Sequence, residues 1–201
     1  MKRLSLMLAA ILLLASFKPE EGYKTGSKAA DFKLKNINGK MVSLSDYKDA
    51  KGFIVVFTCN HCPFAKKYEN RIMALDKKYS VKGYPVIAIN PNDANEVPED
   101  SYQNMQARAK EKGYSFPYLL DETQATAKAF GATRTPHVYI LQKSNTDFVV
   151  KYIGAIDDNS DDEIAVKEKY VEDAINALLV GKEVPVTSTK AIGCTIKWKK
   201  A

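Results

Sequence analysis

The stretch G-F-I-V-V-F-T-C-N-H-C-P-F, residues 52–64, decides the fold of this chain. Residues 53–57 form a continuous apolar run, which is typical of a central β-strand buried on both faces. Apolar side chains then recur at intervals of three and four residues from Phe64 to Tyr79, which is the spacing of an amphipathic helix. Cys59 and Cys62 therefore lie where a buried strand ends and a helix begins.

Strand and helix patterns alternate along the rest of the chain. We expect a β-hairpin at residues 31–44, strands at 84–89 and 116–120, helices at 99–112 and 123–130, an antiparallel pair at 137–141 and 148–153, and a last amphipathic helix over 166–179. This order predicts an α/β fold, in which a central mixed β-sheet is flanked by helices. The fold carries an N-terminal β-hairpin and an inserted strand and helix.

The N-terminus has the layout of a secretory signal. Lys2 and Arg3 precede an uncharged run at residues 4–17, and charged residues follow it. That run is shorter than the roughly 18 to 20 residues of a membrane span, so we expect no stable span. We expect residues 1–21 to be a signal peptide or tether, residues 22–181 one domain, and residues 182–201 a C-terminal tail packed on it. The protein would then be exported to the periplasm or another extracytoplasmic space.

Composition excludes several classes of protein. Lys and Arg number 30 against 24 Asp and Glu, and both signs are scattered along the chain, so nucleic-acid binding has little support. Three cysteines are too few for a disulfide scaffold. A chain of this length can bury one core without such cross-links.

A Cys-x-x-Cys pair serves either redox chemistry or half of a zinc site. A structural zinc site needs two further Cys or His ligands, and the chain offers only His61, His137 and the solitary Cys194. Covalent haem attachment needs His directly after the second Cys, where Pro63 stands. We therefore expect no metal and no cofactor, and a redox-active Cys59–Cys62 disulfide in their place.

The position of the pair supplies a mechanism. If Cys59 lies unshielded just before the first helical turn, free N–H groups and the helix dipole favour its thiolate. His61 lies between the two cysteines, where it can add a positive charge or a hydrogen bond. We expect Cys59 to attack and Cys62, one turn into the helix, to be the resolving thiol. Pro63 suits the first helical turn.

Two further motifs carry a resemblance to a known family. Thr135-Pro136 before a predicted hairpin, together with the Cys-x-x-Cys pair, resembles the thioredoxin superfamily. The opening G-S-K-A-A-D-F-K-L, the hairpin N-I-N-G-K and the segment F-P-Y-L-L-D-E resemble its redoxin (AhpC/TSA-like) branch of exported thioredoxin-like and peroxiredoxin-like proteins. The match covers about residues 26–180.

That resemblance implies a thioredoxin fold and a thiol-disulfide oxidoreductase. It implies that Pro136 is cis and that the Thr135 backbone pairs with an extended segment of a partner protein. The partners would be protein thiols or disulfides and a thiol-disulfide reductant or oxidant. We expect the protein to be a monomer.

The chain departs from the family pattern in two places. Peroxiredoxins resemble P-x-x-x-T-x-x-C, whereas Val56 stands three residues before Cys59, which argues against a typical peroxidase site. A thiol peroxidase with antioxidant activity stays open as the first alternative, and a copper- or haem-handling thiol module as the second. The pair C-N-H-C resembles that of periplasmic oxidants, which favours an oxidising poise. Asp93 and Glu96 are candidates for an acid that assists Cys62.

The tail carries the third cysteine, in G-C-T-I-K-W at residues 193–198. Cys194 is either a buried structural thiol anchored by Trp198 or a third redox thiol able to reach Cys59. His137 either lines the site or is an ordinary strand residue. The acidic run at residues 157–163 is typical of a solvated turn that caps the last helix.

Overall fold

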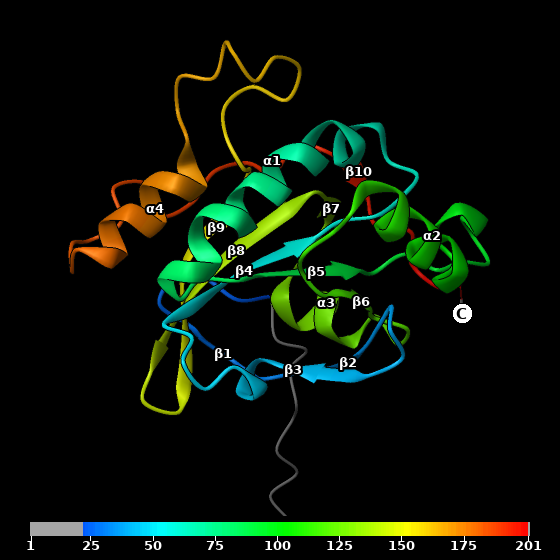
Figure 1. The fold of residues 1–201 in the computed structure, drawn as a ribbon, viewed down its shortest axis with the longest axis horizontal. Helices are drawn as coiled ribbons and strands as arrows, with labels where there is room; N and C mark the ends of the chain where they lie inside the picture. The colour runs from blue at the N-terminus through cyan, green and yellow to red at the C-terminus, as the bar shows by residue number, and fades with distance from the viewer. Residues whose placement is uncertain (1–21, 201) are drawn as a thin grey trace, which may run out of the picture.

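Strand β4 (Gly52–Phe57) lies in the middle of an eight-stranded sheet (Figure 1). The computed structural model describes residues 22–200, and the predicted signal peptide at residues 1–21 lies outside that range. Every residue of β4 is buried, which confirms the prediction from its apolar run. Between residues 22 and 200, no helix combines the length and the apolar character that crossing a membrane requires.

The sheet is mixed, as predicted. Its strands follow the order β1-β9-β8-β4-β5-β6-β2-β3. Their bounds are β1 (Lys28–Ala29), β2 (Lys33–Asn36), β3 (Met41–Ser43), β5 (Val86–Asn90), β6 (Tyr118–Leu120), β8 (His137–Ser144) and β9 (Asp147–Gly154). Strands β4, β5 and β6 run parallel, whereas β8 pairs antiparallel with β4 and with β9. The expected N-terminal hairpin is the antiparallel pair β2 and β3.

Helices cover both faces of the sheet. The helices are α1 (Pro63–Tyr79), α2 (Tyr102–Lys112), α3 (Ala125–Phe130) and α4 (Tyr170–Leu179). Alternate residues of β4 point to opposite faces, so Ile54 and Val56 join the core under α1, α2 and α4. Phe53 and Phe57 join the second core, where α3 packs. Figure 1 shows α1 and α4 on one side of the sheet and α3 on the other.

Three helices begin later than predicted, and for α3 the difference is two residues. Helix α2 begins at Tyr102 rather than at residue 99, because the Ser101 side chain caps it by accepting a hydrogen bond from the Asn104 N–H. Residues Pro98–Asp100 form a separate 3₁₀ turn, η3. Helix α4 begins at Tyr170, which leaves Val166 in the preceding loop. The later start of α2 directs Asp100 toward the paired cysteines.

A second, two-stranded sheet joins distant parts of the chain. Strand β7 (Arg134–Thr135) pairs antiparallel with β10 (Cys194–Thr195) from the C-terminal tail. Figure 1 shows both strands close to the end of the molecule where α1 begins. The tail therefore lies against the region that holds the Cys-x-x-Cys pair.

Candidate functional site

The Cys-x-x-Cys pair lies at the junction predicted from the sequence. Strand β4 ends at Phe57, and α1 begins at Pro63, so Cys62 is the N-cap residue of the helix. Pro63 occupies the first helical position, where its missing N–H costs no hydrogen bond. Cys62 was expected one turn into the helix. The N-cap position corrects that expectation and brings its sulfur to the free N–H groups of the first turn.

Thr135 contacts both sulfurs of the pair. The Thr135-Pro136 peptide bond is cis, as the resemblance implied. The Thr135 hydroxyl lies 3.2 Å from Cys59 Sγ, and the Cys62 thiol lies 3.1 Å from the Thr135 carbonyl oxygen, to which it can donate. Thr135 itself is buried and pairs with Cys194 across the two-stranded sheet. The edge that was expected to receive a partner segment is thus occupied by the chain's own tail.

The prediction of an unshielded Cys59 is wrong in this structure. Cys59 is 3% exposed and Cys62 is 0% exposed. Cys194 is the half-buried member of the three cysteines. Its sulfur lies 2.6 Å from the sulfur of Cys62. Of the two interpretations of Cys194, a structural thiol or a redox thiol able to reach Cys59, the second named Cys59, and the structure places the thiol against Cys62 because the tail approaches from the Thr135 edge.

In the reduced protein the lowered pKa belongs to Cys62, whereas the sequence predicted it for Cys59. The hydrogen bond from Cys59, with smaller contributions from the Cys194 thiol and the Ala65 N–H, lowers the pKa of Cys62 to about 4 in spite of its burial. The Thr135 carbonyl acts in the opposite direction, because only a protonated Cys62 can donate to it. The pKa of Cys59 is raised by its hydrogen bond to Cys62, by burial and by the nearby Asp100 carboxylate. These opposite shifts favour the negative charge of the reduced pair on Cys62.

A buried carboxylate that the sequence did not reveal organises the loop around Cys59. Asp100 is 0% exposed, and its Oδ1 accepts hydrogen bonds from the N–H groups of Asn60 at 2.6 Å and His61 at 3.2 Å. Its Oδ2 lies 2.6 Å from His61 Nδ1 and accepts from Asn92 Nδ2 at 2.7 Å. A carboxylate only accepts, so His61 Nδ1 carries the proton and donates to Asp100. The Cys59 sulfur lies 3.5 Å from the same nitrogen, so its hydrogen bond with His61 is the weaker of the two.

The acid in this network is Asp100, and neither of the two acids that were proposed from the sequence to assist Cys62 belongs to it. Asp93 caps its own turn through Asn95, and Glu96 forms an ion pair with Lys200 at 2.9 Å. The predicted helix start at residue 99 had placed Asp100 in a helical first turn. Ser101 is a residue type that often caps a helix, and recognising it as the cap would have placed Asp100 before the helix.

The same carboxylate belongs to the group of residues that could hold a metal. One ligand atom from each of Cys59, His61 and Asp100 lies within 4.8 Å of the others. The carboxylate already accepts four hydrogen bonds from the protein, which satisfies it without an ion. The arrangement orients His61 and surrounds Cys59 with a fixed hydrogen-bond network.

His137 lies buried beside the sheet end of β4. It pairs in register with Phe57, and its ring lies 4.8 Å from that of Tyr139. The Thr133 N–H donates to its Nδ1 at 3.4 Å. Burial, together with Arg134, lowers the pKa of His137 to about 4, so it is neutral in the folded protein.

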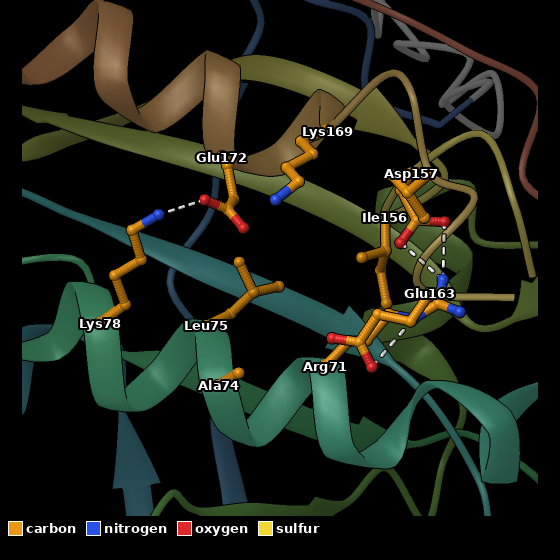
Figure 2. Close-up of a pocket in the computed structure, with 10 residues that line it drawn as sticks. Arg71, Ala74, Leu75, Lys78, Ile156, Asp157, Glu163, Lys169 and Glu172 are labelled. Atoms are coloured by element: carbon orange, nitrogen blue, oxygen red, sulfur yellow. Dashed lines mark hydrogen bonds and ion pairs between the residues drawn. The ribbon is translucent and has the colours of Figure 1, made fainter.

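A separate cleft of about 100 Å³ lies between α1 and the loop before α4 (Figure 2). Here Arg71 donates to both oxygens of Asp157, at 2.9 and 2.7 Å, and both residues are buried. Asp157 was expected in a solvated turn that caps the last helix, and this ion pair corrects that expectation. Figure 2 also shows Lys78 paired with Glu172, so cations and carboxylates alternate along the cleft. None of its lining residues is a cysteine.

Comparison with known proteins places the chain among redox proteins. Residues 25–158 match the AhpC/TSA family. The chain is 26% identical over 147 residues to the thiol-disulfide oxidoreductase ResA of Geobacillus thermodenitrificans, covering 70% of this chain and 78% of that protein. It is 30% identical over 126 residues to the thioredoxin-like protein YneN of Bacillus subtilis, covering 63% and 70%.

Solved structures agree with the fold. An uncharacterized conserved protein from Geobacillus kaustophilus superposes with a TM-score of 0.81 at 42% identity, covering 89% of this chain and 94% of that one. A thiol:disulfide interchange protein described as DsbE-like, from Chlorobium tepidum, superposes with a TM-score of 0.55 at 22% identity, covering 78% and 98%. The latter supports the thioredoxin-like α/β fold alone.

Proposed function

Since the chain belongs to the AhpC/TSA family, we propose that it is a thiol-disulfide oxidoreductase that acts on protein thiols outside the cytoplasm. The similarity to thiol-disulfide oxidoreductases supports the activity. The observation that carries the proposal is the convergence of Cys59 and Cys62 at the start of α1 beside Thr135. That arrangement couples two thiols, of which one carries a stabilised negative charge.

In the proposed cycle, Cys59 attacks a partner disulfide. Its proton passes along the shared hydrogen bond to Cys62 as the mixed disulfide forms and one partner thiolate leaves. That thiolate takes the proton from Cys62. Cys62, again a thiolate, attacks Cys59 Sγ, which closes the Cys59–Cys62 disulfide and releases the second partner sulfur as a thiolate that takes a proton from water. The lowered pKa of Cys62 thus favours the resolving step.

The redox potential of the Cys59–Cys62 pair depends on how well the Cys62 thiolate is stabilised. Hydrogen bonds that stabilise the Cys62 thiolate stabilise the reduced protein, and a stabilised reduced form makes the disulfide more oxidising. Oxidising poise suits an extracytoplasmic space, where disulfides persist. The signal-like pattern of residues 1–21 supports the same location.

The test is trapping of mixed disulfides in a Cys194→Ser background, so that the third thiol cannot release the partner. With a protein substrate that carries disulfides, such as scrambled ribonuclease, the Cys62→Ser variant should accumulate mixed disulfides. Cys59→Ser should accumulate none. If Cys59→Ser traps partners and Cys62→Ser does not, the roles of the two thiols are reversed. If neither variant traps, the pair is not a thiol-disulfide exchanger.

Peroxide reduction is the competing activity. Val56, which stands at the position of the peroxidase threonine, is buried in the sheet and has no hydroxyl, and the hydroxyl beside Cys59 comes from Thr135 instead. We expect hydrogen peroxide to oxidise the reduced protein no faster than it oxidises a free thiol in a stopped-flow assay. Rapid, stoichiometric oxidation of Cys59 would favour a thiol peroxidase instead.

A further inference from the structure

The C-terminal tail is bound to the strand edge beside the paired cysteines as an extended segment. Cys194 pairs with Thr135 and Thr195 pairs with Arg134 in an antiparallel register. The Ile196 N–H continues the pairing by donating to the Thr133 carbonyl at 3.1 Å. The tail thus occupies the place that a partner polypeptide was expected to take.

The fit of this segment is specific. A β-carbon at Gly193 would lie 2.2 Å from the Thr135 carbonyl oxygen, so only glycine allows so close an approach. The Arg134 guanidinium donates to the Gly193 carbonyl at 2.9 Å. Beyond the cysteine, Ile196 is 4% exposed in the core, and the Lys197 N–H donates to Asn92 at 2.8 Å. Anchors on both sides therefore hold Cys194 in place.

The anchored segment brings the sulfurs of Cys194 and Cys62 to 2.6 Å, close to the roughly 2.0 Å of a disulfide bond. We propose that Cys194 is a third redox thiol, which replaces Cys59 as the disulfide partner of Cys62. This inference rests on the proposed function, because it assumes a redox-active Cys59–Cys62 pair. Cys62 then serves as the sulfur shared between two alternative disulfides.

The exchange balances without an external oxidant. In the oxidised pair, the Cys194 thiolate attacks Cys62 Sγ, the Cys62–Cys194 bond forms, and the Cys59–Cys62 bond breaks. The electron pair leaves on Cys59, which takes up the proton that Cys194 released. One disulfide is exchanged for another, so no net oxidation occurs.

The exchange can start only after the Cys59–Cys62 disulfide has formed. In the reduced protein, burial and the neighbouring Cys62 raise the pKa of Cys194 to about 11, which keeps Cys194 a thiol. Once Cys62 is in a disulfide, it carries no charge, so it no longer raises the pKa of Cys194 through its charge. Cys194 is also the most accessible of the three cysteines, so it connects the buried pair with solvent.

The decisive variant is Cys59→Ser, which retains only Cys62 and Cys194. After oxidation with glutathione disulfide, acid quenching and alkylation of free thiols, tryptic peptides are analysed by mass spectrometry. We expect a Cys62–Cys194 linked peptide within the monomer and the loss of both free thiols. Two free thiols, glutathione adducts alone or dimers alone would overturn the inference.

Two further variants separate this inference from the proposed function. In the Cys59→Ser background, Gly193→Val should reduce the yield of the linked peptide at least tenfold, because its side chain collides with Thr135. Ile192→Val, at an exposed neighbour, is the matched control and should leave the yield unchanged. Cys194→Ser should still form the Cys59–Cys62 disulfide. If the Cys194→Ser variant forms no Cys59–Cys62 disulfide, the proposed function is wrong. The result with Cys59→Ser tests only the proposed role of Cys194.

Discussion

Replacing Asp100 by asparagine should lower the pKa of Cys59, because it removes a buried negative charge close to that sulfur. A carboxylate oxygen of Asp100 lies within 4.8 Å of Cys59 Sγ. Two unit charges at that separation repel by about 3.5 kcal/mol at an effective dielectric constant of about 20, and by about 0.9 kcal/mol in water. At about 1.4 kcal/mol per pKa unit, the expected decrease lies between about 0.6 and about 2.5 units.

The measurement needs a protein in which Cys59 titrates alone. Cys62→Ser combined with Cys194→Ser removes both coupled thiols, and the rate of iodoacetamide alkylation against pH then reports the pKa of Cys59. A parallel series with His61→Gln separates the effect of the carboxylate from that of the imidazole. Asp93→Asn is the matched control, because its carboxylate caps a turn in the same loop through Asn95.

The substitution also has a structural cost that must be measured. Asp100 accepts four hydrogen bonds, and an amide replaces one acceptor oxygen with a donor that faces other donors. We expect a loss of about 1–3 kcal/mol in the free energy of unfolding, which urea denaturation measures. An unchanged or raised pKa of Cys59 in a folded Asp100→Asn variant would refute the electrostatic account of the site.

Three further predictions concern stability. The pKa of His137 falls from 6.5 to about 4 on folding, so stability is complete above pH 6.5 and decreases by up to about 3 kcal/mol as the pH falls toward 4; His137→Gln should flatten this dependence in urea titrations, and an unchanged slope would contradict it. Arg71→Met leaves the buried carboxylate of Asp157 without its partner and should cost about 3–5 kcal/mol in urea denaturation; a loss below about 1 kcal/mol would show that the pair is not buried in solution. Gly52→Ala places a β-carbon 2.1 Å from the Leu141 carbonyl oxygen and should lower stability by about 3 kcal/mol, whereas a neutral result would mean that β4 and β8 are spaced differently.

Local sequence patterns were sufficient to predict the scaffold. The apolar run of β4 and the three-and-four spacing of α1 placed the Cys-x-x-Cys pair at a strand-to-helix junction, and the structure confirms both elements. The mixed sheet and the flanking helices followed from the alternation of such patterns. These features depend on residues close together in the chain, because strand and helix periodicities repeat within a few positions.

The chemistry of the sulfurs was decided by contacts between distant segments. Asp100 reaches the loop of Cys59 from 40 residues away, and Cys194 reaches Cys62 from 132 residues away. Charge, burial and thiol pairing depend on what surrounds each sulfur in space, and no local periodicity encodes that environment. The sequence by itself determined where the two thiols lie in the fold, whereas the tertiary structure buried both sulfurs and brought a third thiol beside Cys62.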